Sequence, residues 1–232
     1  KKILENEKIN FSNIDYVSVG WNPSKHMIKY NPLISSFRTM REYNFYTVND
    51  NLLNLQTNRE LGSYTALEHN EKNFPKVYHI NHHLSHASNA FYLSNFKTAA
   101  ILTCDFKGEY ESTTFNLGEN NYIKEIESHN LPNSLGKLYA TFTELLGYKS
   151  DNDEWKVMAM SAFNLDCKKE IKKIKKCYNL FENGKFELVS KYFEYSNAGN
   201  TNHHYTNNLL ELFNINNVIY NSSPSKKQIK IA

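Results

Sequence analysis

Residues 81–92 are Asn81-His82-His83-Leu84-Ser85-His86-Ala87-Ser88-Asn89-Ala90-Phe91-Tyr92, and they directly follow a short strand-like run at residues 77–80. If the segment is helical, the spacing of His82 and His86 places both imidazole rings on one face of the helix, about one turn apart. His83 then points to another face. The spacing therefore brings His82 and His86 close enough to share a single metal ion.

Neutral imidazoles suit a divalent cation such as Fe²⁺ or Zn²⁺, but two histidines on one helix supply only part of a site, which needs at least one further ligand. The alternative interpretation is that the two rings cap the helix or form hydrogen bonds at an interface between two parts of the fold. The spacing alone leaves both interpretations open.

Apolar runs downstream of this helix predict three strands. The strongest is a continuous run at residues 98–104, of the kind found in a covered sheet. Two alternating runs follow at residues 110–117 and 122–128, separated by Gly118-Glu119-Asn120-Asn121. Because this connection is short and rich in turn residues, the three strands are predicted to form an antiparallel meander.

Helical periodicity predicts which side chains are buried. In the histidine helix the apolar residues expected to face the core are Leu84, Ala87, Ala90 and Phe91. A second helix is predicted at residues 135–146, with Asn133 as N-cap and Gly147 as its C-terminal stop. Its apolar residues at the 3.6-residue period are Leu135, Leu138, Tyr139, Phe142, Leu145 and Leu146.

Weaker patterns describe the rest of the chain. A helix end at residues 1–8 leads into a strand at residues 15–21, and the polar, proline-punctuated residues 22–76 are interpreted as an insertion. His26 and His69 in this insertion are interpreted as exposed or partly packed rings, and the pair His203-His204 as solvent-exposed. The elements predicted downstream are a short apolar segment at 155–163, a basic amphipathic helix at 165–178, a strand at 185–189 and a helix at 208–213.

The composition limits the class of protein. The formal net charge of +3 comes from 27 basic and 24 acidic residues among 232, which gives no reason to expect a nucleic-acid or anionic-membrane partner. Three cysteines without a C-x-x-C pair favour a reduced, cytoplasmic setting over a disulfide scaffold. No apolar run approaches the roughly 20 residues of a membrane span.

Four motifs in order resemble the carbamoyltransferase family of the nodulation-protein and antibiotic-tailoring type. The family pattern H-H-x-x-H-A-x-x-A-F-Y, then D-G-x-G-E, S-L-G-x-x-Y and G-E-Y-K-V-M-G-L-A, is matched by the histidine motif and three later segments. These segments are Asp105-Phe106-Lys107-Gly108-Glu109, Ser134-Leu135-Gly136-Lys137-Leu138-Tyr139 and Glu154-Trp155-Lys156-Val157-Met158. Because family proteins are much longer, we expect the chain to be an internal piece of one.

The resemblance implies an α/β fold of the actin-like, ribonuclease-H-like ATPase type. The order of predicted elements, with a new start near residue 98, is consistent with two lobes. Residues 1–97 would then be the remainder of the first lobe, with the insertion at about 22–76, and residues 98–232 the first part of the second. The two-lobed domain would be incomplete in this chain.

The resemblance also implies an activity: an O-carbamoyltransferase that moves a carbamoyl group from carbamoyl phosphate, through a carbamoyl-adenylate made with ATP, to a hydroxyl of a sugar, antibiotic or other small molecule. Family members use iron, so His82 and His86 would bind Fe²⁺, or Zn²⁺, with an aspartate beyond Ala232. A second domain makes the adenylate in the family, so the chain alone would not run the full reaction. A homodimer is compatible with the resemblance.

Further residues are candidates for binding ATP or substrate. In actin-like folds the hairpin after the strong strand approaches the nucleotide phosphates, so Asp105, Gly108, Glu109 and Thr113 are candidates. Glu154 and Lys156 could project together from an extended or irregular segment. Alternatively, these two residues form a salt-bridged pair on the surface, and Asp105 only fixes a turn.

The sequence departs from the family pattern at several glycines. Phe106 stands where the family has the first glycine of the hairpin. The other replacements are Asp153, Ala159 and Asn164 for glycine, Ala162 for proline and Asn133 for histidine. These departures support a rival interpretation, a non-catalytic remnant or metal-binding module. A third interpretation is a relative of the tRNA threonylcarbamoyl-transfer proteins, which share H-x-x-x-H and the fold.

Overall fold

The computed structural model describes residues 2–10, 13–22, 76–182, 184–195, 203–215, 220 and 223–232. The insertion predicted at residues 22–76, with His26 and His69, falls outside these residues except at its two ends. The described chain contains both helices and strands along its length, which confirms a mixed α/β protein. None of the described helices is long and apolar enough to cross a membrane.

The N-terminal part is a helix and a parallel strand pair. Helix α1 (Lys2–Glu7) precedes β1 (Tyr16–Val19), which pairs in parallel with β2 (Lys76–His79) from Tyr16 opposite Lys76 to Val19 opposite His79. Both predicted strands are therefore present: β1 is shorter than the predicted 15–21, and β2 is shifted by one residue from the predicted 77–80. The Ile80 amide continues the ladder by donating a hydrogen bond to the Val19 carbonyl at 2.9 Å, and the chain then enters the histidine helix.

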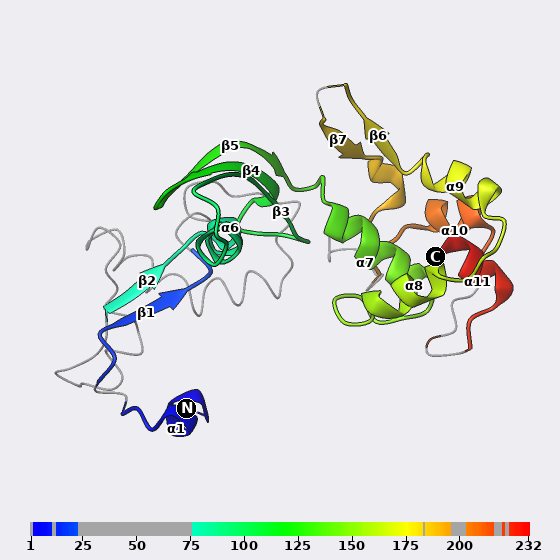
Figure 1. The fold of residues 1–232 in the computed structure, drawn as a ribbon. Coiled ribbons are helices and arrows are strands. Elements are labelled where there is room, and N and C mark those ends of the chain that lie inside the picture. The colour runs from blue at the N-terminus through cyan, green and yellow to red at the C-terminus, as the bar shows by residue number, and fades with distance from the viewer. Residues whose placement is uncertain are drawn as a thin grey trace.

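A curved three-stranded sheet covers that helix, as Figure 1 shows. Strands β3 (Thr98–Cys104), β4 (Glu111–Glu119) and β5 (Tyr122–Asn130) form the predicted antiparallel meander in the order β3-β4-β5. Helix α6 (His82–Tyr92) packs against all three strands. Ala87 and Phe91 of α6 form a small core with Ile101 of β3, so the sheet fixes the position of the histidine helix.

The buried face of α6 differs from the prediction. Leu84 and Ala90 are exposed, whereas His83, Ala87 and Phe91 are buried. These three follow one another at four-residue intervals and form one stripe toward the sheet. Apolar side chains alone suggested a different stripe, because the imidazole of His83 was not counted as a core residue.

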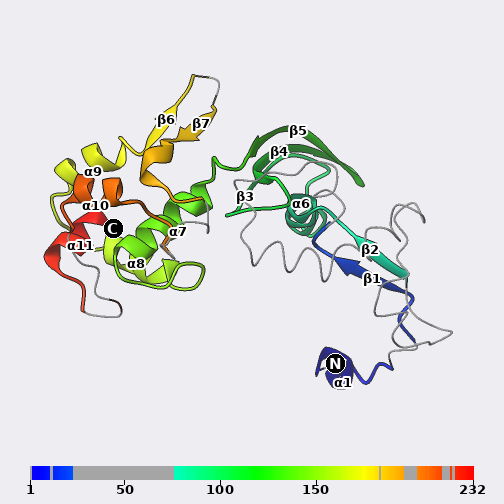
Figure 2. The ribbon, with the colours of Figure 1, turned by 180° about the vertical axis from the view of Figure 1, so that it is seen from behind.

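The second half of the chain is mainly helical, as Figure 2 shows from behind. It has its own hydrophobic core. Leu145, Leu146, Leu209 and Phe213 are among its most buried members. In chain order its elements are α7 (Leu135–Leu145), α8 (Glu154–Ser161), α9 (Lys168–Ile174), β6 (Tyr178–Leu180), β7 (Phe186–Leu188), the 3₁₀ helix η3 (Ser190–Tyr192), α10 (Asn207–Phe213) and α11 (Lys226–Ile231).

Helix α7 was predicted from the most regular pattern in the sequence and is confirmed. Two details of the prediction, its N-cap and two of its buried residues, are corrected. Its N-cap is Ser134 and not Asn133, because the Ser134 hydroxyl accepts a hydrogen bond from the Lys137 amide at 3.0 Å. Leu135 and Tyr139 at its start are exposed by 44% and 39%. Gly147 follows the helix with φ of +87°, the left-handed conformation of a C-terminal stop.

Two downstream predictions were wrong. The segment with Glu154 and Lys156 is a helix, α8, and not extended or irregular. The basic helix predicted at residues 165–178 is the shorter α9, which buries none of its residues, and the end of that range starts β6 instead. The strand at 185–189 and the helix at 208–213 are confirmed as β7 and α10.

Candidate metal centre

Three potential metal ligands from two elements converge. His82 Nε2 lies 2.7 Å and His86 Nε2 3.2 Å from Asp105 Oδ2, and the two ring nitrogens lie 3.1 Å apart. Helix α6 supplies both histidines, and Asp105 follows directly after β3, which packs on α6. The side chains of His82, Asp105 and His86 are exposed by 25%, 36% and 53%, so an ion at this cluster would be open to solvent on one side.

Contacts behind the cluster orient its donor atoms. The Gly20 carbonyl accepts a hydrogen bond from His82 Nδ1 at 3.1 Å, which leaves Nε2 as the nitrogen directed at Asp105. A ligating histidine needs such a partner on its other nitrogen. Oδ1 of Asp105 accepts from the Phe106 amide at 2.6 Å, so Oδ2 is the oxygen that faces the histidines. Nitrogen and carboxylate donors in this arrangement fit Fe²⁺ or Zn²⁺.

The electrostatics of the cluster favour a protonated His82 beside an ionised Asp105. Burial opposes protonation of His82, but the hydrogen bonds to Asp105 and Gly20 and the nearby carboxylates raise the pKa of His82 above its ordinary value. Burial likewise opposes ionisation of Asp105, and the hydrogen bonds from His82 and Phe106 lower its pKa. The carboxylate is therefore ionised and available to a cation.

His83 has a structural role that the sequence did not reveal. Its ring is buried, its Nδ1 lies 2.7 Å from Thr103 Oγ1, and its Nε2 donates to the Glu111 carbonyl at 2.9 Å. Burial lowers the pKa of His83, so the ring is neutral. A Cβ at Gly108 would lie 2.6 Å from the His83 ring. The hairpin after β3 therefore rests on His83, and only glycine fits at residue 108.

Glu109 and Thr113 are buried inside the scaffold. Glu109 is 1% exposed, and its carboxylate accepts hydrogen bonds from the His82 amide at 3.1 Å and the Asn22 amide at 2.6 Å. A carboxylate at this point stabilises the N-terminus of α6. Thr113 is 4% exposed, and its hydroxyl contacts Cys104 Sγ at 3.9 Å. Both residues therefore stabilise the scaffold behind the cluster.

The N-terminal end of α7 also packs against the hairpin that follows β3. Ser134 is fully buried, and its hydroxyl donates to the Phe106 carbonyl at 2.7 Å while it caps the helix. A Cβ at Gly136 would lie 2.5 Å from both the nitrogen and the Cα of Phe106. The S-L-G motif therefore has a packing role, because its serine and glycine let the helix backbone approach the Asp105-Phe106 peptide.

A cavity of about 360 Å³ adjoins the cluster. It is lined by Cys104, Asp105, Phe106, Leu135, Gly136, Tyr139, Ala140, Asp151 and Glu154. The structure thus brings together two of the predicted substrate-binding residues, Asp105 and Glu154. Glu154 Oε1 accepts from the Asp151 amide at 2.7 Å.

Gly108, Glu109, Thr113 and Lys156 are not among the residues that line this cavity. Lys156 forms an ion pair with Asp153 at 2.9 Å and not with Glu154. Its ammonium group also lies near the rings of Tyr148 and Trp155, 5.5 Å from each centroid. Lys156 is therefore engaged within its own helix and the preceding loop.

A buried network beside Phe106 was missed in the sequence. Lys137 is 5% exposed, its Nζ lies 2.6 Å from His204 Nδ1, and burial lowers its pKa to about 8. Glu144, also buried, accepts from His203 Nδ1 at 2.9 Å and from the His204 amide. The prediction that His203 and His204 are exposed was wrong, since both are half-buried. Only the spacing of Lys137 and Glu144 on one face of α7 could have suggested the network.

We expect Ser134→Ala to lower the free energy of unfolding by about 1–2 kcal/mol, because it removes both the N-cap and the hydroxyl bound to Phe106. Urea unfolding measures the change. Ser225→Ala at the exposed N-cap of α11 is the matched control and should cost less, about 0.5 kcal/mol. Equal losses for both variants would show that Ser134 acts only as a cap.

Comparison with known proteins identifies a family over nearly the whole chain and relatives over parts of it. The family described as carbamoyltransferase N-terminus matches residues 5–230. Nodulation protein NolNO of Sinorhizobium fredii is 32% identical over 113 residues, which are 49% of this chain and 16% of that protein.

Two uncharacterized proteins are also similar. One from Synechocystis sp. is 33% identical over 125 residues, 54% of this chain and 20% of that protein. One from Methanocaldococcus jannaschii is 39% identical over 88 residues, 38% of this chain and 17% of that protein. The matched part of this chain thus corresponds to a fifth or less of the length of each of these relatives.

Proposed function

The chain belongs to the carbamoyltransferase N-terminus family, and from this membership we propose that the complete protein is an O-carbamoyltransferase. Its carbamoyl donor is carbamoyl phosphate, ATP activates the carbamoyl group as carbamoyl-adenylate, and the acceptor is a hydroxyl group of a small molecule. The nodulation protein among the relatives supports the same broad class.

The observation that carries the proposal is that Asp105 belongs to two features at once. The Asp105 carboxylate completes the cluster with His82 and His86, and Asp105 is also one of the residues that line the 360 Å³ cavity. A substrate in this cavity would lie beside the cluster. Small-molecule sites typically have about 300–1,000 Å³, so the volume suits part or all of a nucleotide-sized ligand.

In the proposal, His82, His86 and Asp105 hold one Fe²⁺ or Zn²⁺, and a further aspartate beyond Ala232 remains an expected ligand. A divalent ion bound there would polarise an acyl or phosphate oxygen. Two backbone groups of this chain orient the ligands: the Gly20 carbonyl orients His82, and the Phe106 amide orients Asp105. Glu154 and the exposed ring of Tyr139 bound the space for the substrate.

We further propose that the protein has the actin-like ATPase architecture, with residues 1–97 and 98–232 contributing to two lobes. The supporting features are the family membership and the meander that begins at β3. The hairpin of residues 105–109, between β3 and β4, would take the position of the phosphate-contacting hairpin of such folds.

A remnant without activity is the second candidate, and Phe106 is the observation that favours it, because this residue lines the cavity where the family has glycine. The ring is not loose, however: it lies edge-on to His204 at 5.8 Å and beneath the Lys137 ammonium. The other glycine replacements cause no backbone strain, since Asp153, Ala159 and Asn164 lack positive φ.

Titration of the complete protein with ATP in a calorimeter tests whether the cavity binds ATP. Leu135→Trp enlarges a side chain that lines the cavity and is 44% exposed, so we expect it to weaken ATP binding at least about tenfold, or 1.4 kcal/mol. Leu180→Trp, at a 73% exposed residue outside the cavity, is the matched control and should leave the affinity unchanged.

In the same titration Phe106→Gly should change the affinity by less than about threefold, under 1 kcal/mol, because the ring is held by His204 and Lys137. No measurable binding by the unmodified protein, together with binding restored by Phe106→Gly, would favour the remnant and contradict the enzyme.

A further inference from the structure

Lys137 occupies a position that is unfavourable for a lysine. It lies in the first turn of α7, where the helix dipole opposes a positive charge, and it is 5% exposed. Burial lowers the pKa of Lys137 to about 8, because removal from water disfavours the charged form. The resulting loss of stability is present in full below that pKa, so the charged side chain destabilises the fold at neutral pH.

The ammonium group of Lys137 connects three segments of the chain. It donates a hydrogen bond to Nδ1 of His204 at 2.6 Å, and burial keeps that imidazole neutral by lowering the pKa of His204. The same group lies 5.8 Å from the ring centroid of Phe106 and 5.4 Å from that of Tyr195, which suits cation–π contacts. The rings of His204 and Phe106 are also in contact, with centroids 5.8 Å apart. Lys137 and His204 therefore hold the Phe106 ring together.

We propose that Lys137 is a positioning residue for Asp105 and that it acts through Phe106. The Phe106 amide donates a hydrogen bond to Oδ1 of Asp105 at 2.6 Å, and Oδ2 of the same carboxylate faces His82 and His86. A shift of Phe106 would therefore turn the carboxylate away from the two histidines. The inference rests on the metal centre proposed above and adds a residue behind its third ligand.

The other contacts of Phe106 hold its backbone and not its ring. The Ser134 hydroxyl donates to the Phe106 carbonyl at 2.7 Å, and Gly136 lies against the Phe106 nitrogen and Cα. Because Phe106 stands where the family pattern has glycine, its ring needs contacts that a glycine hairpin does not. A buried charge that destabilises the fold and contacts the neighbour of a metal ligand indicates a role in the site.

The charged form of Lys137 is the one that contacts the rings at neutral pH. Three carboxylates, those of Glu144, Asp151 and Glu194, raise its pKa, whereas burial and the charge of Lys107 lower it. Since the resulting pKa is about 8, the ammonium form predominates at pH 7. A side chain of similar length without a charge would fill the same space but would lose both the cation–π contacts and the hydrogen bond to His204.

Hydrogen exchange in the complete protein, without added metal, tests the positioning directly. The amides of Asp105, Phe106 and Gly108 are all hydrogen-bonded, so their exchange reports on opening of the hairpin. In Lys137→Met we expect these amides to exchange at least about tenfold faster. The melting temperature should not fall, because the substitution removes a buried charge. Faster local exchange without a loss of global stability distinguishes positioning from a general structural role.

Titration of the complete protein with Fe²⁺ and Zn²⁺ measures the consequence for the metal centre. Lys137→Met should weaken metal binding about tenfold, the effect of losing a residue that orients a ligand. Phe106→Gly should have an effect of similar size. Since Lys137 acts through the Phe106 ring, the double variant should bind metal no more weakly than the weaker of the two single variants.

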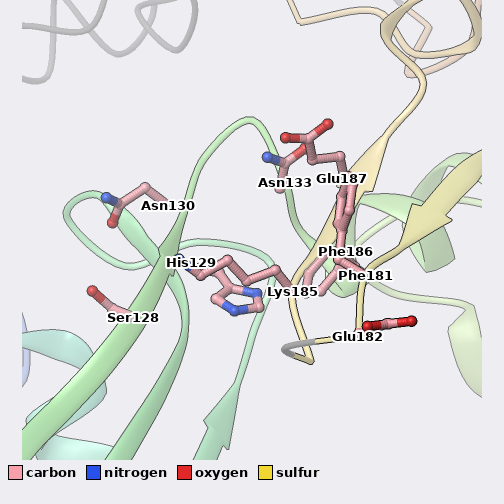
Figure 3. Close-up of a pocket in the computed structure, with 9 residues that line it drawn as sticks. All are labelled: Ser128, His129, Asn130, Asn133, Phe181, Glu182, Lys185, Phe186 and Glu187. Atoms are coloured by element: carbon pink, nitrogen blue, oxygen red, sulfur yellow. The ribbon is translucent and has the colours of Figure 1, made fainter.

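Two lysines elsewhere provide controls for the same substitution. Nζ of Lys173 lies 5.7 Å from the ring centroid of Phe213, a contact of the same kind in the helical part of the chain. Lys185, labelled in Figure 3, lines a second cavity of about 590 Å³ between β5 and the β6–β7 hairpin and pairs with Glu127 at 3.3 Å. Lys173→Met and Lys185→Met should leave both hairpin exchange and metal affinity unchanged.

The proposal would be overturned by unchanged hairpin exchange in Lys137→Met, or by faster exchange throughout the protein together with a lower melting temperature. Unchanged metal affinity in that variant, or additive losses in the double variant, would also overturn it. If the unmodified protein binds no metal, the metal centre itself is wrong. Faster hairpin exchange in Lys137→Met would even then support the role of Lys137 in holding Asp105.

Discussion

Replacing His82 and His86 together by alanine is expected to weaken metal binding by the complete protein at least about 100-fold. Loss of a residue that merely orients a ligand already costs about 10–100-fold in metal affinity. Removing two donors that lie 3.1 Å apart and both contact Asp105 must cost more. Elemental analysis after dialysis, followed by titration with Fe²⁺ and Zn²⁺, measures the change.

His203→Ala is the matched control for this experiment. His203 also lies beside a carboxylate, with its Nδ1 2.9 Å from Glu144 Oε1, but it belongs to the network around Lys137 and not to the cluster. The control should keep its metal. Unchanged metal content in the double variant, with loss of metal in His203→Ala, would move the metal site to the other network.

The second large effect is expected for Gly136→Ala, which should lower the free energy of unfolding by about 3 kcal/mol or more. The added Cβ would lie 2.5 Å from the nitrogen and Cα of Phe106, and backbone atoms cannot rotate away as a side chain can. Overpacking of this kind typically costs about 1–3 kcal/mol and occasionally more. Chemical denaturation measures the loss.

Gly184→Ala separates the clash from the effect of adding a methyl group. Nothing lies within 4 Å of a Cβ at Gly184, so only its left-handed φ of +80° opposes the change, at a cost of about 1–2 kcal/mol. A loss at Gly136 no larger than that at Gly184 would mean that α7 and the hairpin of residues 105–109 separate easily. The close contact between them would then not define the site.

Local patterns predicted the elements that form the scaffold. The alternation in residues 110–128 gave the β4–β5 hairpin, and the 3.6-residue period gave α7, because these signals depend on neighbours in the sequence. The N-cap was misplaced by one residue, since Asn133 and Ser134 are both good caps and only the hydroxyl of Ser134 reaches the Lys137 amide. The short α9 and the start of β6 were merged for lack of a break signal.

The candidate site was predictable only in part. The spacing of His82 and His86 correctly predicted that the two rings are neighbours, because both lie on one helix. Asp105 was assigned to a nucleotide pocket instead, because its approach to the histidines depends on how α6 packs against β3. Glu109 and Lys137 likewise acquire their partners, the His82 amide and His204, through tertiary contacts that no local pattern encodes.

In our proposal, the complete protein transfers a carbamoyl group with the help of a metal ion held by His82, His86 and Asp105. The most direct measurement is AMP formation from ATP by the complete protein with carbamoyl phosphate and a panel of hydroxyl acceptors, because attack of a hydroxyl on carbamoyl-adenylate releases AMP. We predict that AMP formation requires carbamoyl phosphate, stops after chelation or in Asp105→Asn, and returns when Fe²⁺ is added to the chelated protein. AMP formation that survives both chelation and Asp105→Asn, or none in the metal-loaded protein, would contradict the proposal.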